Sequence, residues 1–274
     1  MTWIAVDESG GTVRAWIMTG PDAQLLQGLS GSGLPDLIGP HLADGSVTTV
    51  LRSGGAAGIF GPVPSHPLGA GPVPVPYADS RAAVFAVPGL SQAAPTDFTQ
   101  GEETAIAGFI GQHPDWDGVL CLPGRHSRWA QVSAGEVVSF RSFLTGELFA
   151  VLAAPLQQSD STDAVFLDAL GNAISHPERI AAALFSLRAQ TVLGDPEAAE
   201  ARTRLSGLLI GLELAATRPY WLGQNVALIV SGDFGARYDT ALRAQGIHAK
   251  IADRTQMTLA GLRLAHEMLL ARRD

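Results

Sequence analysis

The stretch Trp3-Ile4-Ala5-Val6-Asp7-Glu8-Ser9-Gly10-Gly11-Thr12-Val13-Arg14-Ala15-Trp16-Ile17-Met18 places two apolar runs on either side of a glycine-rich turn. The first run predicts a buried strand that ends at Asp7, and the second predicts a strand over residues 13–18. Two strands joined by so short a turn form an antiparallel β-hairpin. The backbone N–H groups of the turn, residues 9–12, can also cradle a phosphate group.

A second strand-rich segment opens the other half of the chain. Residues 119–122, 129–132 and 137–142 predict strands, with Ala134-Gly135 turning between the last two. Predicted helices follow, and the chain ends in the order strand, helix, strand, helix. Because both halves open with strands and a glycine turn and then become helical, we expect two layered α/β domains with a cleft between them. We place these domains at residues 1–112 and 113–274.

Two further segments bear on the site and the core. A helix is expected over residues 104–112, whereas residues 53–76 are so rich in Gly and Pro that they predict an ordered loop with an extended edge segment. Within the long helix expected over 196–217, one apolar face is predicted to be buried. That face consists of Leu205, Leu208, Leu209, Leu212 and Ala216.

Composition and charge exclude several classes of protein. The net charge of −8 argues against a nucleic-acid binder, which needs a basic face. The one cysteine, Cys121, cannot form an internal disulfide. Since the amino terminus carries no signal-peptide pattern and no apolar run reaches membrane-spanning length, we expect a cytoplasmic protein without a membrane partner. The sequence contains no zinc-like Cys/His cluster and no Walker A string.

Several phrases of the chain, taken together, resemble the 2-dehydro-3-deoxygalactonokinase family. They follow one another in the family's order at about its spacing, over about two thirds of the chain, and residues 7–16 also fit the family's first phosphate turn. The phrases are Pro88-Gly89-Leu90, Gly101-Glu102-Glu103-Thr104, Leu122-Pro123-Gly124-Arg125-His126-Ser127-Arg128-Trp129, Phe143-Leu144-Thr145-Gly146-Glu147-Leu148, Arg188-Ala189-Gln190-Thr191-Val192-Leu193-Gly194 and Leu205-Ser206-Gly207-Leu208-Leu209-Ile210-Gly211.

The resemblance implies a fold and an activity. The wider superfamily, which includes glycerol kinase and hexokinase, has two ribonuclease-H-like domains of the actin/hexokinase-like fold around an interdomain cleft. The family uses ATP, with Mg²⁺, to phosphorylate a 2-keto-3-deoxy sugar acid, nominally 2-dehydro-3-deoxy-D-galactonate, to its 6-phosphate. Small-molecule partners are therefore expected, and a homodimer is left open.

The resemblance also assigns roles on the substrate side. Asp7 would help to hold magnesium, which needs only one carboxylate beside phosphate oxygens. Glu102 is the candidate general base for the attacking hydroxyl, with Glu103 as the second choice and as a substrate contact. Arg14 offers a cation for the substrate carboxylate, and Ser53 lies where the family binds its substrate. Acids at a helix start are also explained by the helix dipole alone.

A second set of residues is expected to bind the nucleotide. In the first turn, residues 10–12, backbone N–H groups are expected to bind phosphate. In the second turn, residues 124–127, the candidates are a backbone N–H, a histidine ring and a serine hydroxyl. The N-termini of two expected helices are also candidates, since a helix start can bind an anion. Thr145 also fits a plain helix cap, and a histidine in a turn is often structural. These residues are Gly10, Gly11, Thr12, Gly124, His126, Ser127, Thr145 and Gly232.

Three departures from the family pattern leave other interpretations open. Glu8 replaces an aromatic residue in the first turn, Arg125 replaces a threonine in the second, and Arg52 is new beside the substrate region. An acid near a polyphosphate is repulsive, so neutralising Glu8 is expected to tighten ATP binding about five- to tenfold. If Glu8 instead points to solvent or contacts the metal, neutralising it leaves the affinity unchanged or lowers it. The alternatives are a degenerate homologue that senses a sugar acid or nucleotide, and a kinase for a different carboxylated sugar.

Overall fold

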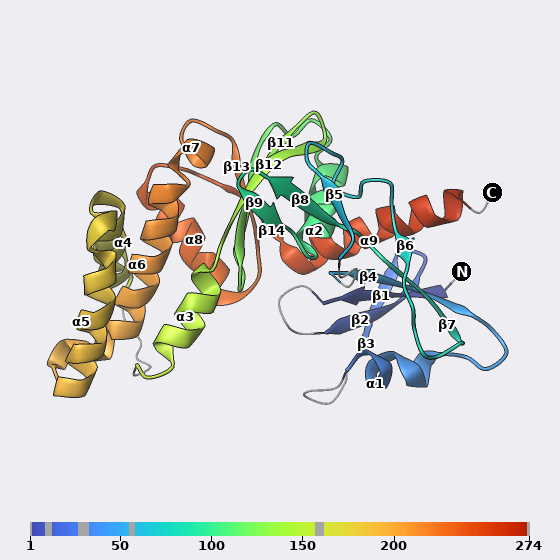
Figure 1. The fold of residues 1–274 in the computed structure, drawn as a ribbon, viewed down its shortest axis with the longest axis horizontal. Coiled ribbons are helices and arrows are strands. Elements are labelled where there is room, and N and C mark those ends of the chain that lie inside the picture. Colours follow the sequence, from blue (N-terminus) through green and yellow to red (C-terminus); the bar gives the residue numbers. More distant parts are fainter. Residues whose placement is uncertain (1, 9–12, 27–32, 55–57, 157–161, 273–274) are drawn as a thin grey trace. The chain divides into compact units, whose positions relative to one another are not determined.

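The computed structural model describes residues 2–8, 13–26, 33–54, 58–156 and 162–272. By its internal contacts the chain divides into two compact units (Figure 1). The first comprises Met1–Asp117, Val132–Phe140 and Ala252–Asp274, and the second comprises Gly118–Gln131 and Arg141–Ile251. These units are discontinuous along the chain, because the last helix counts with the first unit. The domain ranges 1–112 and 113–274 stay a prediction about independently folding parts.

The first unit is built on a mixed sheet that opens with the expected hairpin. β1 (Thr2–Asp7) pairs antiparallel with β2 (Arg14–Thr19), which sets Asp7 opposite Arg14. β1 also pairs in parallel with β4 (Thr48–Ser53), which sets Asp7 beside Ser53. These three polar residues therefore lie at one end of the sheet. The remaining strands are β3 (Asp22–Leu26), β6 (Val73–Pro74) and β7 (Ala82–Ala86), in the order β3-β2-β1-β4-β7-β6.

This unit also contains a small three-stranded sheet. β5 (Phe60–Pro62), β8 (Gly89–Ala93) and β9 (Thr96–Phe98) form three strands in the order β5-β8-β9. Residues 53–76, expected to be an ordered loop with an extended edge segment, contain the short strands β5 and β6, and Gly89 begins β8. A Cβ atom at Gly89 would lie 2.3 Å from the carbonyl oxygen of Thr99. The glycine is therefore needed for close packing rather than for a turn.

Two helices of the first unit pack backbone against backbone. These are α2 (Glu102–Gln112) and α9 (Arg254–Ala271). A Cβ at Gly108 would lie 1.9 Å from the carbonyl oxygen of Met257, and one at Gly261 would lie 1.9 Å from that of Thr104. Only glycine fits at such a crossing. The start of α9 is thereby fixed beside the start of α2. The unit also contains α1 (Leu34–Ile38) and the 3₁₀ turn η1 (Gly39–His41).

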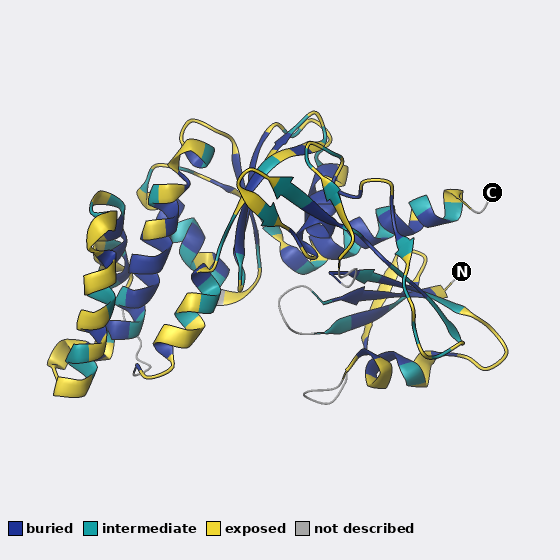
Figure 2. Cartoon of the chain, viewed as in Figure 1, coloured by how far each residue is buried: buried dark blue, intermediate teal, exposed yellow. Residues whose placement is uncertain are grey.

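A five-stranded sheet belongs mostly to the second unit. Its strands β10 (Gly118–Leu122) and β13 (Val226–Val230) pair in parallel at its centre, and β10 is buried along its whole length (Figure 2). The strands expected over 129–132 and 137–142 are present in the structure. The other strands are β11 (Ser127–Ser133), β12 (Glu136–Phe143) and β14 (Lys250–Asp253), in the order β12-β11-β10-β13-β14.

Helices complete the second unit. α6 (Ala201–Ala216) packs closely on α4 (Asp163–Ser175), since a Cβ at Gly207 would lie 2.5 Å from the carbonyl oxygen of Phe166. Our predicted buried face of α6 is wrong at Leu212 and Ala216, which are exposed. The glycine side of α6 faces α4 and turns these two residues outward. The unit also contains α3 (Thr145–Ala153), η2 (Pro177–Arg179), α5 (Ile180–Leu193), η3 (Pro196–Glu200), α7 (Arg218–Trp221) and α8 (Gly232–Ala244).

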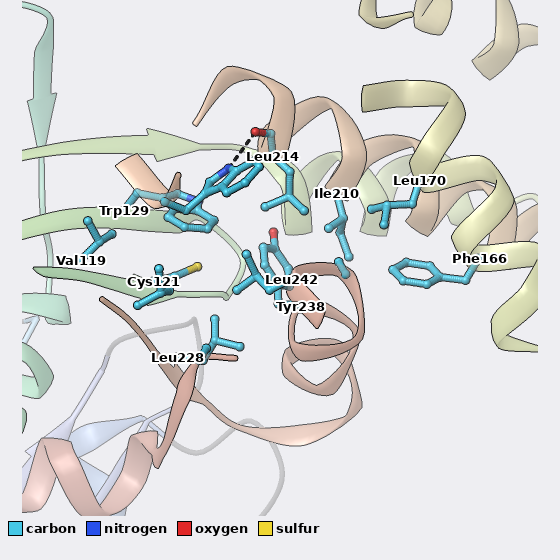
Figure 3. Packing of buried hydrophobic residues seen from close by; sticks show 14 residues of the cluster. Val119, Cys121, Trp129, Phe166, Leu170, Ile210, Leu214, Leu228, Tyr238 and Leu242 are labelled. Atoms are coloured by element: carbon cyan, nitrogen blue, oxygen red, sulfur yellow. Dashed lines mark hydrogen bonds between the residues drawn. The ribbon is translucent and has the colours of Figure 1, made fainter. Parts of the chain in front are cut away.

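An aromatic core joins these helices to the sheet (Figure 3). Trp129 of β11 and Tyr238 of α8 are fully buried there, next to Ile210 of α6 and Phe166 of α4. The indole Nε1 of Trp221 donates to the carbonyl oxygen of Leu214 at 2.9 Å. In the described part of the chain, no helix combines the length and the apolar character that a membrane span requires.

Candidate active site

The end of the first unit's sheet carries a buried aspartate and an arginine. The Nη2 of Arg14 donates to Oδ2 of Asp7 at 2.6 Å, and its Nη1 donates to Oγ1 of Thr255 at 3.0 Å. The side chain of Asp7 is fully buried, whereas that of Arg14 is one third exposed (33%). Arg14 therefore links the end of β1 to the first turn of α9 and still reaches solvent.

A second ion pair joins two of the residues that depart from the family pattern. Arg52 donates to Oε2 of Glu8 from Nη2 at 2.5 Å and from Nε at 3.1 Å. Both side chains are largely buried, and the backbone N–H of Glu8 donates to the carbonyl of Ser53 at 3.1 Å. The new cation thus neutralises the new anion at the same edge of the sheet.

Glu102 lies at the start of α2, beside a second buried arginine. The structure begins α2 two residues earlier than we expected, which puts Glu102 in its first turn. Its Oε1 lies 3.6 Å from Nη2 of Arg254, and both side chains are less than a tenth exposed. The backbone N–H of Gln100 donates to Oε2 of Glu102 at 2.9 Å. Ser53 ties β4 to this helix start, since its Oγ donates to the carbonyl of Gly101 at 3.2 Å.

Glu103 points into the protein. It has no solvent-exposed surface, and its carboxyl accepts hydrogen bonds from Oγ1 of Thr99 at 2.7 Å and from the backbone N–H of Gly101 at 2.9 Å. Burial, aided by the neighbouring charge of Glu102, raises the pKa of Glu103 from its ordinary 4.5 to about 7. The structure thus encloses the residue that was our second choice as base.

In the second unit, the turn after β10 lies against the start of α3. A Cβ at Gly146 would lie 2.1 Å from the carbonyl oxygen of Gly124. Oε2 of Glu147 accepts from Nε of Arg125 at 2.8 Å, and Nε2 of His126 lies 3.1 Å from the same oxygen. Two hydrogen bonds lower the pKa of Glu147, and the one from Arg125 has a larger effect than the one from His126. The positive charge of Arg125, which also departs from the family pattern, is therefore neutralised by a nearby acid.

Two of the hydroxyl residues predicted to meet phosphate, Ser127 and Thr145, are turned inward. Oγ of Ser127 donates to Oε2 of Glu213 at 2.5 Å, and Oγ1 of Thr145 donates to the same oxygen. Both are buried. Gly232, in contrast, is exposed at the start of α8, with a φ of +66° that favours glycine. Gly10, Gly11 and Thr12 lie outside the described residues.

Sequence reasoning missed three residues of these regions, namely Arg254, Thr255 and Glu213. Arg254 and Thr255 lie on the last helix, far along the chain from the residues that they contact. The one signal for Glu213 was an acid within the otherwise apolar run Leu208-Leu209-Ile210-Gly211-Leu212-Glu213-Leu214. A charged residue in such a run requires partners if it is buried.

The fold identifies the class of protein. The activator of the 2-hydroxyisocaproyl-CoA dehydratase from Clostridium difficile, solved with bound ADPNP, superposes with a TM-score of 0.54 at 12% identity over 100% of this chain and 97% of that one. At that identity the likeness shows the fold alone. Together with the mixed sheets, it confirms the predicted α/β fold of the actin/hexokinase-like class.

The family follows from closer relatives. The family model described as 2-keto-3-deoxy-galactonokinase matches residues 35–265. The Escherichia coli (strain K12) 2-dehydro-3-deoxygalactonokinase is 29% identical over 96% of this chain and 97% of its own. A Sinorhizobium meliloti crystal structure assigned to the same enzyme superposes with a TM-score of 0.82 at 28% identity, over 97% of this chain and 99% of that one. The chain belongs to the 2-keto-3-deoxy-galactonokinase family.

One relative is matched over a shorter region. The probable 2-dehydro-3-deoxygalactonokinase DgoK1 of Rhizobium meliloti (strain 1021) is 35% identical over 65% of this chain, and the match spans 62% of its length, less than two thirds. The family is one of carbohydrate kinases, which implies the use of ATP. The predictions of family, fold class and enzyme class are confirmed.

Proposed function

We propose that this chain transfers the γ-phosphoryl group of ATP to a hydroxyl of a 2-keto-3-deoxy sugar acid. The proposed substrate is 2-dehydro-3-deoxy-D-galactonate and the product is its 6-phosphate, as the names of its relatives suggest. One observation carries the proposal at the level of residues. Arg14 and Glu102 both contact the first turn of α9, Arg14 through Thr255 and Glu102 through Arg254. An anion-binding cation and a candidate base are thereby held by one helix start.

Glu102 is the proposed general base. The attacking hydroxyl needs a carboxylate that orients it and accepts its proton as the bond to phosphorus forms. Glu102 retains a little exposed surface, whereas Glu103 is fully enclosed and its carboxyl is used by Thr99 and Gly101. A guanidinium at 3.6 Å also makes a negative charge at Glu102 tolerable in a buried position.

Arg14 is the proposed partner of the substrate carboxylate. A guanidinium has five N–H donors in a fork that matches a carboxylate, and two of its nitrogens are occupied by Asp7 and Thr255. Because Arg14 is one third exposed, its remaining donors can meet a ligand. Ser53 is the proposed neighbour on the substrate side, where its hydroxyl donates to Gly101 in this structure.

ATP and Mg²⁺ complete the proposal. Among the described residues, no group of three or more His, Cys, Asp or Glu could hold a metal alone. Mg²⁺ takes one carboxylate, phosphate oxygens and waters, and we assign Asp7, at the end of β1, as that carboxylate. Bound Mg²⁺ would neutralise phosphate charge. We propose that the turn at Gly124, the ring of His126 and the N-terminus of α8 at Gly232 contact the nucleotide, with residues 10–12 at the first phosphate turn.

A specific observation favours a working kinase over a degenerate sensor. The residues that depart from the family pattern occur in neutralising pairs, Arg52 with Glu8 and Arg125 with Glu147. An unpaired Glu8 beside ATP would repel its phosphates, but the charge of an acid paired with a guanidinium largely cancels at the distance of a phosphate. The departures are therefore compatible with ATP binding.

The experiment is a coupled ATPase assay with Mg²⁺ against a panel of 2-keto-3-deoxy sugar acids, with ATP binding followed by calorimetry. Turnover with 2-dehydro-3-deoxy-D-galactonate above all others supports the proposal. Turnover with another member of the panel points to a different carboxylated sugar, and ATP binding without any turnover points to the sensor. The homodimer stays a prediction, which light scattering of the purified chain tests.

A further inference from the structure

One buried carboxylate in the second unit accepts hydrogen bonds from four side chains. Glu213, in α6, is 2% exposed. Its Oε2 accepts from Ser127, Thr145 and the hydroxyl of Tyr238, the last at 2.9 Å, and its Oε1 accepts from Nε1 of Trp129 at 2.7 Å. All four donors are neutral.

These donors come from separate segments of the chain. Ser127 directly follows the turn 124–126, Thr145 is the first residue of α3, and Tyr238 lies in the second turn of α8, six residues after Gly232. The turn and α8 contain residues that we propose for nucleotide contact, and the start of α3 packs against the turn, where the backbone N–H of Glu147 donates to the carbonyl of Arg125 at 2.8 Å. Glu213 is bonded to all of them, and it lies too deep to contact a nucleotide itself.

The chemistry of the cluster depends on the carboxyl group. A carboxylate only accepts hydrogen bonds, so two oxygens suit four donors. A glutamine of the same shape would direct an N–H₂ group at donors and leave buried bonds unmade, which costs more than a missing surface bond. Burial raises the pKa of Glu213, and the four hydrogen bonds oppose that rise. The arrangement therefore restrains three segments through one group.

We propose that Glu213 is a positioning residue of the nucleotide site, which sets the spacing of the 124–127 turn, the start of α3 and the start of α8. This inference rests on the proposed function, because it assumes that the turn and the start of α8 bind ATP. It assigns to Glu213 an effect on ATP affinity and none on the affinity for the sugar acid, whose proposed contacts belong to the other unit.

Two variants and one control test it. Glu213→Gln removes the carboxylate, and Tyr238→Phe removes a single donor while keeping the buried ring. Trp221→Phe is the matched control, because it removes a buried hydrogen bond of the same core, to the carbonyl of Leu214, without touching Glu213. The dissociation constants of Mg-ATP and of the sugar acid are measured by calorimetry, together with each melting temperature.

We expect Mg-ATP to bind at least tenfold more weakly to Glu213→Gln and about three- to tenfold more weakly to Tyr238→Phe. The dissociation constant of the sugar acid should stay within twofold of the wild-type value in both variants. Trp221→Phe should melt earlier yet bind Mg-ATP within twofold of wild type. If Glu213→Gln does not fold, Tyr238→Phe decides alone. Unchanged ATP affinity in Tyr238→Phe, or an equal loss for both ligands, would overturn the inference.

Hydrogen exchange without ligand separates this inference from the proposed function. Peptides covering 122–129, 145–153 and 232–240 should exchange faster in Tyr238→Phe than in Trp221→Phe if Glu213 restrains them. Should the wild type bind no ATP while these peptides behave as expected, the proposed function fails and the restraint by Glu213 stands. Equal exchange in the two variants would contradict the restraint itself.

Discussion

The two candidate regions hold their buried acids in opposite ways. In the first unit, Asp7, Glu8 and Glu102 each lie beside an arginine, at 2.6, 2.5 and 3.6 Å. In the second unit, Glu213 is surrounded by four neutral donors. Apart from Glu103, which neutral donors enclose, the buried acids of the first region form charge pairs, whereas the second region has one carboxyl held by hydroxyl and indole groups.

The difference indicates different tasks. An ion pair can exchange one partner for a ligand of the same charge, as when a substrate carboxylate shares Arg14 with Asp7. A carboxyl that is surrounded by buried donors cannot exchange one of them for a ligand in this way, because each hydrogen bond it loses leaves a buried polar group unsatisfied. The charge pairs are therefore suited to binding a ligand directly, whereas Glu213 is suited to holding in place the segments that bind one.

The largest expected effect comes from the acid assigned to chemistry. Glu102→Gln keeps the shape of the side chain and removes the base, so turnover should fall by about two to four orders of magnitude, or about 3–5 kcal/mol in the barrier. Sugar-acid binding should change little. Steady-state kinetics and calorimetry measure the two quantities.

Glu267→Gln, an exposed position of α9, is the control and should retain full activity. If Glu102→Gln keeps more than half of the wild-type rate, Glu102 is not the base. The proposed contrast between Glu102, which acts in the chemistry, and Glu213, which supports other segments, would then be wrong.

The next effect is on stability, through Glu103. Because its pKa is raised to about 7, folded Glu103 keeps a proton that the unfolded chain releases above pH 4.5. Stability should therefore fall as pH rises from about 4.5 to about 7, by about 3 kcal/mol in full. Glu103→Gln removes this dependence. Urea unfolding of both proteins across pH 4–8 tests it, and parallel curves would refute it.

The sequence predicts local structure better than it predicts these regions. The hairpin over residues 3–18 follows from apolar runs within 16 residues of one another, and both its strands are present. The contact of Arg14 with Thr255 joins residues 241 apart, and that of Thr145 with Glu213 joins residues 68 apart. No local pattern specifies such pairs, because they depend on how the helices pack.

Glycines illustrate the same limit. Gly89 follows Pro88 after β7, and it begins β8 at a place where no side chain fits. The small residue was visible in the sequence. Its reason, the approach of the Thr99 backbone, was visible only in the structure.

A smaller effect is expected at Arg14. Arg14→Gln should raise the KM for the sugar acid about 10- to 100-fold, since a charge-assisted hydrogen bond is worth about 1.5–3 kcal/mol, while the KM for ATP should stay nearly constant. Arg14→Lys keeps the positive charge but lacks the forked N–H donors, so its KM for the sugar acid should lie between those of wild type and Arg14→Gln. Arg243→Gln, which breaks an exposed pair with Asp239, is the control. An equal rise in both KM values would mean that Arg14 supports the fold only.

The smallest effect is expected at Glu8. The sequence alone predicted a five- to tenfold tighter Mg-ATP complex on neutralisation, but Arg52 already neutralises Glu8 in the structure. Glu8→Gln should therefore change Mg-ATP affinity by less than about threefold in calorimetry. A gain of fivefold or more would show that the Glu8 charge is felt at the phosphate in spite of Arg52.

The most direct test of the whole account is ³¹P NMR of a reaction containing 2-dehydro-3-deoxy-D-galactonate, Mg-ATP and the wild-type chain, run beside Glu102→Gln. The account predicts that a phosphomonoester signal and ADP grow together with the wild type. In the variant, both signals should appear at least a hundredfold more slowly. ATP that stays intact with the wild type, or that is hydrolysed to inorganic phosphate without a phosphomonoester, would contradict a sugar-acid kinase.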